Sequence, residues 1–329
     1  MQRRAVTFYL LLNFAEDSLK PAINKMIYLK EFRIPKDSWV DCYFTPSMYA
    51  NDLPRNMPRV CENTHLNTWY PWDTLYNRGL REFQFEDITI LYGGNGSGKT
   101  TLLNVIAQRL QLERLTRYNR STCFDDYVNI CEHVTTDLAS ARCIQRGRIL
   151  VSDDVFDAIL KKREENERID QRREELVQEY RNMPELPRHN LTDPEVYKEY
   201  RRIYDASRKS CSKFVKANLQ RNTLEQSNGE SAFDFFVESI NNDSLVLLDE
   251  PENSLSAKWQ MELVKFITGA VRAFRCQFII ATHSPFVLSI PGARIYDLDS
   301  YPIKSERWYN LENVRSYYEL FKENESYFK

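Results

Sequence analysis

A glycine-rich stretch restricts what this chain can fold into more than any other feature. Residues 93–100 read Gly-Gly-Asn-Gly-Ser-Gly-Lys-Thr, between an apolar run at 88–92 and a helix-forming segment at 101–107. Glycines let the backbone turn its N–H groups toward phosphate oxygens, and a helix N-terminus adds a favourable dipole. The pattern therefore predicts a phosphate-binding loop between a strand and a helix. The residues expected to contact a nucleotide are Gly93, Asn95, Gly96, Ser97, Gly98, Lys99, Thr100 and Thr101.

Two side chains of this loop and two carboxylates further along have the chemistry of a nucleotide-hydrolysing site. We expect Lys99 to reach the β- and γ-phosphates of ATP, and the Thr100 hydroxyl to ligate Mg²⁺. A second apolar strand, 245–248, runs straight into Asp249 and Glu250. We predict that Asp249 holds Mg²⁺, directly or through water, and that Glu250 polarises the attacking water as general base.

Two further segments offer groups to a γ-phosphate. A third apolar strand, 276–281, ends just before His283, which at a strand tip can sense the phosphate or orient the attacking water. Ser227, Gly229 and Glu230 stand at the start of a predicted helix, where they offer a hydroxyl and backbone N–H groups to an anion. Taken alone, each segment also has an ordinary structural interpretation. His283 could be a core histidine, and the segment from Ser227 to Glu230 could be a helix N-cap.

The alternation of apolar strands and helices predicts the fold class. Strands are expected at 88–92, 245–248, 276–281 and 293–298, and the run 149–151 is strand-like. The pattern indicates an α/β fold, a P-loop NTPase with a doubly wound, mostly parallel sheet. The charged stretch 160–204 has helical spacing and predicts an inserted helical hairpin. We divide the chain into three parts. Residues 1–109 are a β-rich part with the P-loop, and residues 110–225 are the helical insertion. Residues 226–329 are the rest of the same ATPase lobe.

The P-loop, the Ser-x-Gly-Glu segment, the Asp-Glu strand and the strand-tip histidine, in this order, resemble the ABC-type ATPases. The resemblance covers roughly residues 88–300. It implies an ABC ATPase head that binds ATP and Mg²⁺ and works as a head-to-tail homodimer. In such a dimer, Ser227 and Gly229 lie over the γ-phosphate bound by the opposite subunit. The loop 249–256, Asp-Glu-Pro-Glu-Asn-Ser-Leu-Ser, looks most like soluble ABC-like AAA proteins, close to SMC-type heads and to OLD-type and Septu-type bacterial defence ATPases.

The chain departs from the family pattern at several positions. Ser256 stands where many members carry an Asp that helps couple the two sites, and the signature reads Ser-Asn-Gly-Glu instead of Ser-Gly-Gly-Gln. Two candidates stand for the glutamine-loop residue, Gln145 and the strand end 152–154. Tyr70 or Trp72 either stacks on adenine or is a core aromatic.

The charge and the cysteine content restrict which partners the chain can bind and which cell compartment it fits. Lys and Arg number 45 against 47 Asp and Glu, so we do not expect a globally basic nucleic-acid binder. A local basic face is either solvated or in contact with nucleic acid or an acidic partner. Its residues share one helix face: Arg202, Lys209, Lys213 and Lys216. No apolar run approaches the roughly 18 residues of a membrane helix. Seven cysteines without a Cys-x-x-Cys pair fit a reducing cytoplasm.

Three functions fit these observations. The first is a cytoplasmic ABC-like ATPase that hydrolyses ATP to switch or assemble a partner, in anti-phage defence or DNA transactions. The segment after His283 is too short for a fused nuclease, so the effector is expected to be a separate protein. The second is the motor subunit of an ABC transporter, and the third is a slow-hydrolysing ATP-dependent scaffold. The long segment before the P-loop disfavours the transporter, although Met26–Lys30 also reads as a first strand and makes Met26 an alternative start.

Overall fold

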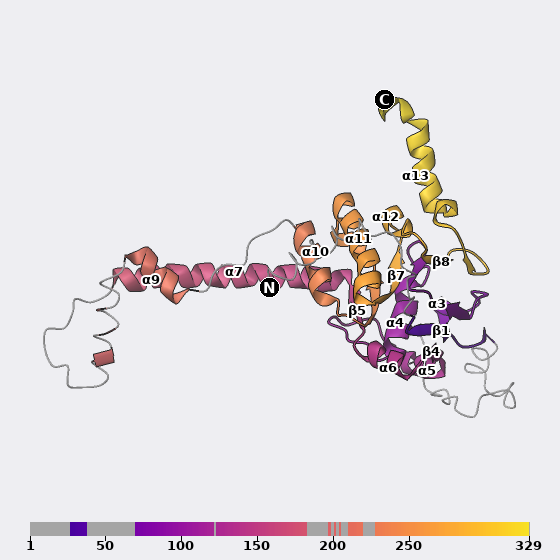
Figure 1. Cartoon of the computed structure of the whole chain (residues 1–329), viewed down its shortest axis with the longest axis horizontal. Coiled ribbons are helices and arrows are strands. Elements are labelled where there is room, and N and C mark those ends of the chain that lie inside the picture. The colour runs from indigo at the N-terminus through magenta and orange to yellow at the C-terminus, as the bar shows by residue number, and fades with distance from the viewer. Residues whose placement is uncertain are drawn as a thin grey trace. The chain divides into compact units, whose positions relative to one another are not determined.

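The computed structural model divides the chain into two units, Met1–Val155 with Asn228–Lys329, and Phe156–Ser227 (Figure 1). The residues that the structure describes are 27–37, 70–121, 123–182, 197–198, 201, 204, 210–219 and 228–328. None of the helices in this described part combines the length and the apolar character that a membrane crossing requires.

The described residues of the first unit contain a six-stranded sheet with the order β5-β6-β7-β3-β8-β9. The strands are parallel except β9, which pairs antiparallel with β8 at one edge. Their bounds are β3 (Ile88–Tyr92), β5 (Arg148–Val151), β6 (Leu245–Asp249), β7 (Gln277–Thr282), β8 (Arg294–Asp297) and β9 (Lys304–Ser305). From β3 the chain goes to β5, returns through β6 and β7, and crosses β3 to reach β8. The strand before the P-loop therefore lies where the strand order reverses.

Helices connect these strands, as the alternation in the sequence predicts. The helix α4 (Lys99–Arg109) packs on β6 and β7, and α11 (Ala257–Phe274) packs on β7. Buried residues of α11 recur at helical spacing, among them Leu263, Phe266 and Ile267. The other helical elements of this unit are α3 (Trp72–Leu75), α5 (Phe124–Ile130), α6 (Leu138–Gln145), α10 (Asn228–Ser239), η1 (Pro251–Ser254), α12 (Pro285–Leu288), η2 (Trp308–Asn310), α13 (Glu312–Glu323) and η3 (Glu325–Phe328).

Both faces of the central strands are buried. In β6, all of Leu245–Leu248 is inaccessible to solvent. Alternate residues, Leu245 and Leu247, join the large core that contains Leu102 and Leu103 of α4. Successive side chains of a strand point to opposite faces, so the other two residues fill the second face. The continuous apolar runs thus form central strands, and the predicted α/β fold with a mostly parallel sheet is confirmed.

A second, antiparallel sheet has the order β2-β1-β4. Its strands are β1 (Leu29–Arg33), β2 (Glu82–Gln84) and β4 (Glu132–Thr135). Gln277, at the start of β7, ties this sheet to the central one. Its Oε1 accepts the N–H groups of Tyr28 and Leu29, each at 2.9 Å, and its Nε2 donates to the Leu29 carbonyl at 2.9 Å. The buried amide is thereby satisfied. The strand β1 begins at Leu29, later than the predicted strand 26–30.

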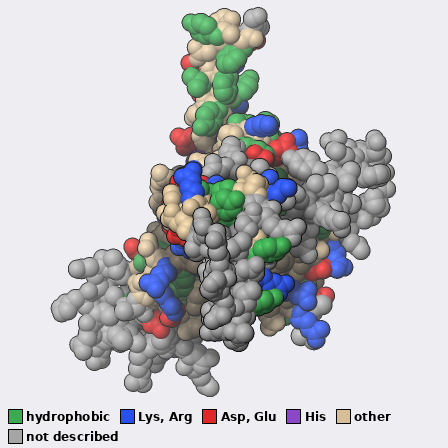
Figure 2. Space-filling view, turned by 90° about the vertical axis from the view of Figure 1, so that its left-hand side faces the viewer, with side chains coloured by type: hydrophobic (Ala, Val, Ile, Leu, Met, Phe, Trp, Pro, Cys, Tyr) green, Lys and Arg blue, Asp and Glu red, His purple; other side chains and the backbone are tan. Residues whose placement is uncertain are grey.

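The last long helix, α13, presents apolar side chains to solvent. Four of them are 44–54% exposed: Tyr317, Tyr318, Leu320 and Phe321. Figure 2 shows apolar side chains along the column at the top of that view, which is α13. The start of the helix is held by Asn313, whose N–H donates to the Tyr92 hydroxyl at 3.1 Å. The helix is thus fixed at its base to the strand that precedes the P-loop.

The helix α7 (Ser152–Arg181) runs from the end of β5 into the second unit, which also contains α9 (Cys211–Asn218). Leu176 of α7 packs against Phe214 and Val215 of α9. The charged stretch between the two segments of the first unit is therefore helical where the structure describes it.

The predicted division of the chain differs from these units in one respect. Residues 110–155, which the sequence pattern groups with the helical insertion, contain β4 and β5 and belong to the first unit. The reason is a long-range pairing, because β5 lies beside β6 with Val151 opposite Asp249. The run 149–151 is strand-like in the sequence, but no local pattern shows which strand it pairs with.

Candidate active site

Neighbouring parallel strands end at the same edge of the central sheet, and chemically active residues follow these ends. The strand β3 leads into Gly93, β6 ends at Asp249, and β7 leads into His283. The last residues of β3 and β7, Tyr92 and Thr282, are directly paired. In open α/β sheets, ligands bind at this carboxyl edge, where the strand order reverses. The structure therefore brings together three segments that the sequence assigns to one site.

The glycine loop turns back on itself and holds Lys99. Gly96 and Gly98 have φ angles of +81° and +94°, which glycine adopts without strain. A Cβ atom on Gly93 would come 2.4 Å from Ser97 Oγ, so a larger residue there would force Ser97 to shift. The Lys99 ammonium donates to the Gly93 carbonyl at 2.8 Å and to the next carbonyl at 2.9 Å, and the side chain is 4% exposed. The loop thus holds a desolvated cation at the edge of the sheet.

Oxygen atoms suited to a hard divalent cation meet between α4 and β6. Thr100 Oγ1 donates to Asp249 Oδ1 at 3.0 Å. Burial raises the pKa of Asp249 to about 6, and the bond from Thr100 partly opposes this shift. Ser97 Oγ is buried and has no hydrogen-bond partner among the described residues. Hydroxyl and carboxylate oxygens are ligands that Mg²⁺ accepts, so these residues fit the ion. Within the described ranges, no group of three or more His, Cys, Asp or Glu side chains is placed to hold a metal ion.

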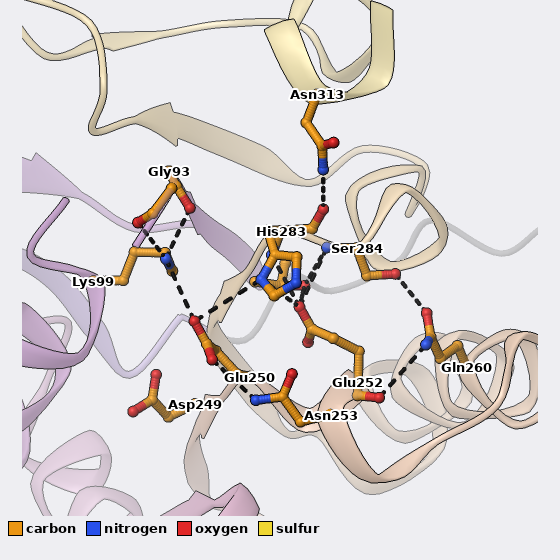
Figure 3. A network of polar contacts seen from close by, with 12 residues as sticks. Gly93, Lys99, Asp249, Glu250, Glu252, Asn253, Gln260, His283, Ser284 and Asn313 are labelled. Atoms are coloured by element: carbon orange, nitrogen blue, oxygen red, sulfur yellow. Dashed lines mark hydrogen bonds and ion pairs between the residues drawn. The ribbon is translucent and has the colours of Figure 1, made fainter. Parts of the chain in front are cut away.

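Glu250 lies between the P-loop lysine and the strand-tip histidine (Figure 3). Its Oε1 is 3.5 Å from Lys99 Nζ and 3.9 Å from His283 Nδ1. Its φ angle of +47° is left-handed, so the chain turns sharply between β6 and η1. Asn253, in η1, donates through Nδ2 to Glu250 Oε2 at 3.0 Å. The turn and the amide together hold the carboxylate beside the P-loop.

Glu252 belongs to the site although its own sequence context does not single it out. Its Oε1 accepts hydrogen bonds from Thr282 Oγ1 at 2.6 Å, from the His283 N–H at 2.9 Å and from the Ser284 N–H at 3.2 Å. The same oxygen is 3.5 Å from His283 Nδ1, and the Glu252 side chain is 5% exposed. Glu252 thus ties η1 to the segment that follows β7.

Two residues from the C-terminal part of the chain also reach the site. Asn313 Nδ2 donates to the His283 carbonyl at 2.7 Å, and Asp299 Oδ2 accepts the Gly94 N–H at 2.7 Å. No motif marks either residue. Asp299 reaches the P-loop because it follows β8, which pairs with β3.

The predicted signature segment is only partly described. Ser227 lies outside the described residues, whereas Gly229 and Glu230 are in the first turn of α10. A Cβ atom on Gly229 would come 2.7 Å from Trp259 Cδ1. The glycine therefore has a packing reason, because the first turn of α10 lies against the indole ring. Its expected place over the ATP of a second subunit stays a prediction.

The two candidates for the glutamine-loop residue lie in different places. The segment 152–154 follows β5 and starts α7, next to Asp249, whereas Gln145 ends α6. Asp154 is 2% exposed, and its Oδ2 accepts the Val151 N–H at 2.9 Å. The strand end 152–154 is therefore the candidate at the carboxyl edge.

The two aromatic candidates for adenine stacking are packed against other rings. Trp72 is 1% exposed and meets Tyr127 edge-on, with the ring centroids 4.8 Å apart. Tyr70 stacks on Phe124 at 5.7 Å. The structure favours the interpretation of Trp72 as a core aromatic.

The predicted basic face is also only partly described. Arg202 and Lys209 lie outside the described residues, whereas Lys213 and Lys216 are exposed on α9. Phe214, on the other side of α9, packs toward α7. The exposed lysines are compatible with a solvated face and with an anionic partner, so both alternatives stay open.

Two protein-family models match the chain. The model described as "ATPase family associated with various cellular activities (AAA)" matches residues 89–188. The model described as "AAA domain, putative AbiEii toxin, Type IV TA system" matches residues 220–289. The first match includes the P-loop, and the second includes Asp249, Glu250 and His283. The chain contains a P-loop ATPase domain. No curated protein matches its sequence.

Two solved structures resemble this P-loop ATPase in part. One is a dimeric ATP-binding cassette in a post-hydrolysis state, bound to ADP and Pi. It is 17% identical, with 70% of this chain and 90% of that chain covered and a TM-score of 0.32. Another is the Smc head domain from Pyrococcus furiosus, with an extended coiled coil and bound to the C-terminal domain of ScpA. It is 11% identical, with 74% and 95% covered and a TM-score of 0.35. Likeness at this level extends neither to the activity nor to the assembly of those proteins.

Proposed function

We propose that this P-loop ATPase is ABC-like, hydrolyses Mg-ATP between two subunits, and uses the cycle to switch or assemble a separate effector protein. One observation carries the proposal. The Lys99 ammonium, the Glu250 carboxylate and the His283 imidazole converge at one edge of the sheet, with Glu250 Oε1 3.5 Å from the first and 3.9 Å from the last. A cation for phosphate, a base for water and a group to orient that water are the parts that hydrolysis needs.

In the proposed reaction, the N–H groups of the P-loop and the Lys99 ammonium bind the phosphates. Lys99 then leaves the Gly93 carbonyl and Glu250, its partners in this structure. Glu250 is thereby released to take a proton from the attacking water, which His283 orients. Thr100 and Asp249 would hold Mg²⁺, which neutralises charge on the phosphate oxygens when it is bound.

The proposed working unit is a head-to-tail homodimer, in which Ser227 and Gly229 of one subunit cover the γ-phosphate held by the other. The resemblance to ABC-type ATPases supports this arrangement. The position of Gly229 in the first turn of α10 supports it too, because N–H groups there have no acceptor within the helix. We place the effector in anti-phage defence or in DNA transactions, and the protein in the cytoplasm.

Replacing the proposed base tests the hydrolysis. Glu250→Gln keeps the size of the side chain and removes the proton acceptor, so the rate of phosphate release should fall about 100-fold or more. Equilibrium binding of a fluorescent ATP analogue should persist. The matched control is Glu262→Gln, which breaks an exposed ion pair with Lys265 and should keep the wild-type rate. Equal rates in wild type and Glu250→Gln would contradict the proposed base, and a wild type without turnover would contradict the ATPase.

The same variant tests the shared site and the partner. Because it binds Mg-ATP without completing hydrolysis, Glu250→Gln should sediment as a closed dimer in Mg-ATP. A monomer under these conditions would contradict the shared site. Tagged Glu250→Gln purified from native cells in Mg-ATP should carry a separate effector protein along, whereas an integral membrane protein would favour the transporter motor.

A further inference from the structure

Glu252 is a buried carboxylate that the proposed reaction does not use. The residue is 6% exposed, and its Oε1 accepts the Thr282 hydroxyl and two backbone N–H groups. Its Oε2 is buried and has no hydrogen-bond partner among the described residues. A neutral amide oxygen could accept the same three hydrogen bonds without the cost of burying a charge. The negative charge of Glu252 therefore indicates a neighbouring side chain whose orientation or proton position depends on that charge.

The imidazole of His283 is that neighbouring side chain. Its Nδ1 is 3.5 Å from Glu252 Oε1 and 3.9 Å from Glu250 Oε1, so Glu252 is the nearer carboxylate. Figure 3 shows the ring between the two carboxylates. The Glu252 side chain is 5% exposed and fixed by its three donors, whereas Glu250 is 25% exposed and also contacts Lys99. The Glu252 carboxylate can therefore orient the His283 ring, while the Glu250 carboxylate stays available to react.

The backbone of His283 is held from both sides. Glu252 accepts its N–H at 2.9 Å, and Asn313 Nδ2 donates to its carbonyl at 2.7 Å. Because the N–H and the carbonyl are both fixed, the direction of the side chain depends on the contacts of the ring alone. The polar contacts that the structure gives the ring are at Nδ1, with Glu252 Oε1 at 3.5 Å and Glu250 Oε1 at 3.9 Å.

We propose that Glu252 is a positioning residue for His283, an inference that rests on the proposed ATPase function. The Glu252 carboxylate keeps the imidazole proton on Nδ1 and leaves the lone pair on Nε2. A neutral imidazole has one donor and one acceptor nitrogen, and the partner of one nitrogen sets the state of the other. Nε2 then accepts a hydrogen bond from one proton of the attacking water, while Glu250 takes the other proton. Glu252 acts on the reaction through His283.

Substituting glutamine separates the charge from the anchoring. Glu252→Gln keeps an oxygen for the three donors but has no charge to hold the Nδ1 proton. We expect kcat to fall about 10- to 100-fold, as for other groups that orient a reacting side chain. The KM for ATP should not change. The melting temperature should fall slightly, because the new NH2 group takes the place of the buried Oε2, which has no partner among the described residues. In a His283→Ala background the same substitution should lower kcat no further, because both changes remove one interaction. Glu262→Gln serves again as the control with wild-type turnover.

The tautomer of His283 can be measured without turnover. The chain has four histidines, so labelling with ¹⁵N-histidine gives four imidazole spin systems, and His283→Ala identifies one of them. At a pH above the imidazole titration range, the wild type should carry the His283 proton on Nδ1. In Glu252→Gln, part or all of it should move to Nε2. The matched variant Asn313→Ala, which frees the carbonyl but keeps the carboxylate, should keep the proton on Nδ1.

The outcomes are distinct. A wild-type kcat in Glu252→Gln, losses that multiply in the double variant, or an unchanged tautomer would each overturn the role of Glu252. A wild-type protein that does not hydrolyse ATP would overturn the proposed function instead. The tautomer measurement would then still decide whether Glu252 sets the proton position on His283.

Discussion

The carboxyl edge of the central sheet and the helical unit Phe156–Ser227 are stabilised in different ways. At the edge, β6 and β7 are buried along their whole length, and one carboxylate oxygen of Glu252 accepts three hydrogen bonds. In the helical unit, exposed charged side chains pair along α7, as Arg172 does with Glu175 and Glu179. Its described core consists of a few residues from α7 and α9: Leu176, Phe214 and Val215.

The carboxyl edge therefore has the fixed geometry that a reaction needs, whereas the helical unit has fewer buried contacts to hold it in one geometry. Burial of apolar surface contributes roughly 25 cal/mol per Å², whereas an exposed ion pair contributes about 0.2–1 kcal/mol. Groups that react need a fixed geometry. The contacts of Lys99, Glu250 and His283 lie at the carboxyl edge of the buried central strands. Regions with few buried contacts open more easily, as is common for segments that move when a partner binds.

The largest effect that we expect comes from removing the buried cation of the edge. Lys99→Ala deletes the ammonium that contacts the P-loop carbonyls and leaves Glu250 without this counter-ion where phosphates should bind. Affinity for Mg-ATP should fall about 100-fold or more, because each charge-assisted hydrogen bond contributes about 1.5–3 kcal/mol. Titration calorimetry with a non-hydrolysable analogue measures the loss. Lys265→Ala, on the exposed side of α11, should bind like the wild type, and equal affinities in all three proteins would refute the role of Lys99.

Truncating one core residue in each region tests whether the two are stabilised separately. Leu247→Ala leaves a cavity in a fully buried strand, and the ATPase unit should lose about 2–5 kcal/mol of unfolding free energy. Phe214→Ala should loosen the packing of α7 on α9 and keep ATP hydrolysis near the wild-type rate. Hydrogen exchange should rise across α9 in Phe214→Ala while β6 stays protected. Loss of protection in β6 in both variants would show that the two regions unfold together.

The smallest effect on ATP hydrolysis is expected at the basic face. On the nucleic-acid hypothesis, replacing Lys209, Lys213 and Lys216 by Ala removes three phosphate contacts. The slope of log affinity against log salt for duplex DNA should then become shallower by about 2.7, since each contact contributes about 0.9. Fluorescence anisotropy at several salt concentrations measures this slope, and ATP hydrolysis without DNA should not change. If affinity and slope both match the wild type, the face is a solvated one.

The candidate reacting groups were predictable because each lies in a short, local pattern. The stretch 93–100 has the glycine spacing of a P-loop, and Asp249 and His283 follow continuous apolar runs. Parallel strands have their carboxyl ends at one edge, so their convergence could be expected before the structure. The structure places Glu250 between Lys99 and His283, and Thr100 beside Asp249, whereas the roles of these residues in hydrolysis stay predictions until they are measured.

The residues that hold the reacting groups were not predictable. Glu252 has no periodic or motif context beyond its place in the loop 249–256, and Asn313 stands in a helix far from the motifs. Their contacts depend on the neighbour relations of β6, β7 and β3, which no local pattern records. The same holds for the unit to which residues 110–155 belong, because the strand-like run 149–151 does not show by itself that it pairs with β6.

The sequence by itself determined that the candidate reacting groups follow apolar strands, because glycine spacing and strand hydrophobicity are local properties of the chain. Only the tertiary structure decided which strands are neighbours, and with that the contacts of Glu252, Asn313 and Asp299 at the site. Those contacts join segments distant in the chain. They form only when burial of both sheet faces has fixed the strand order.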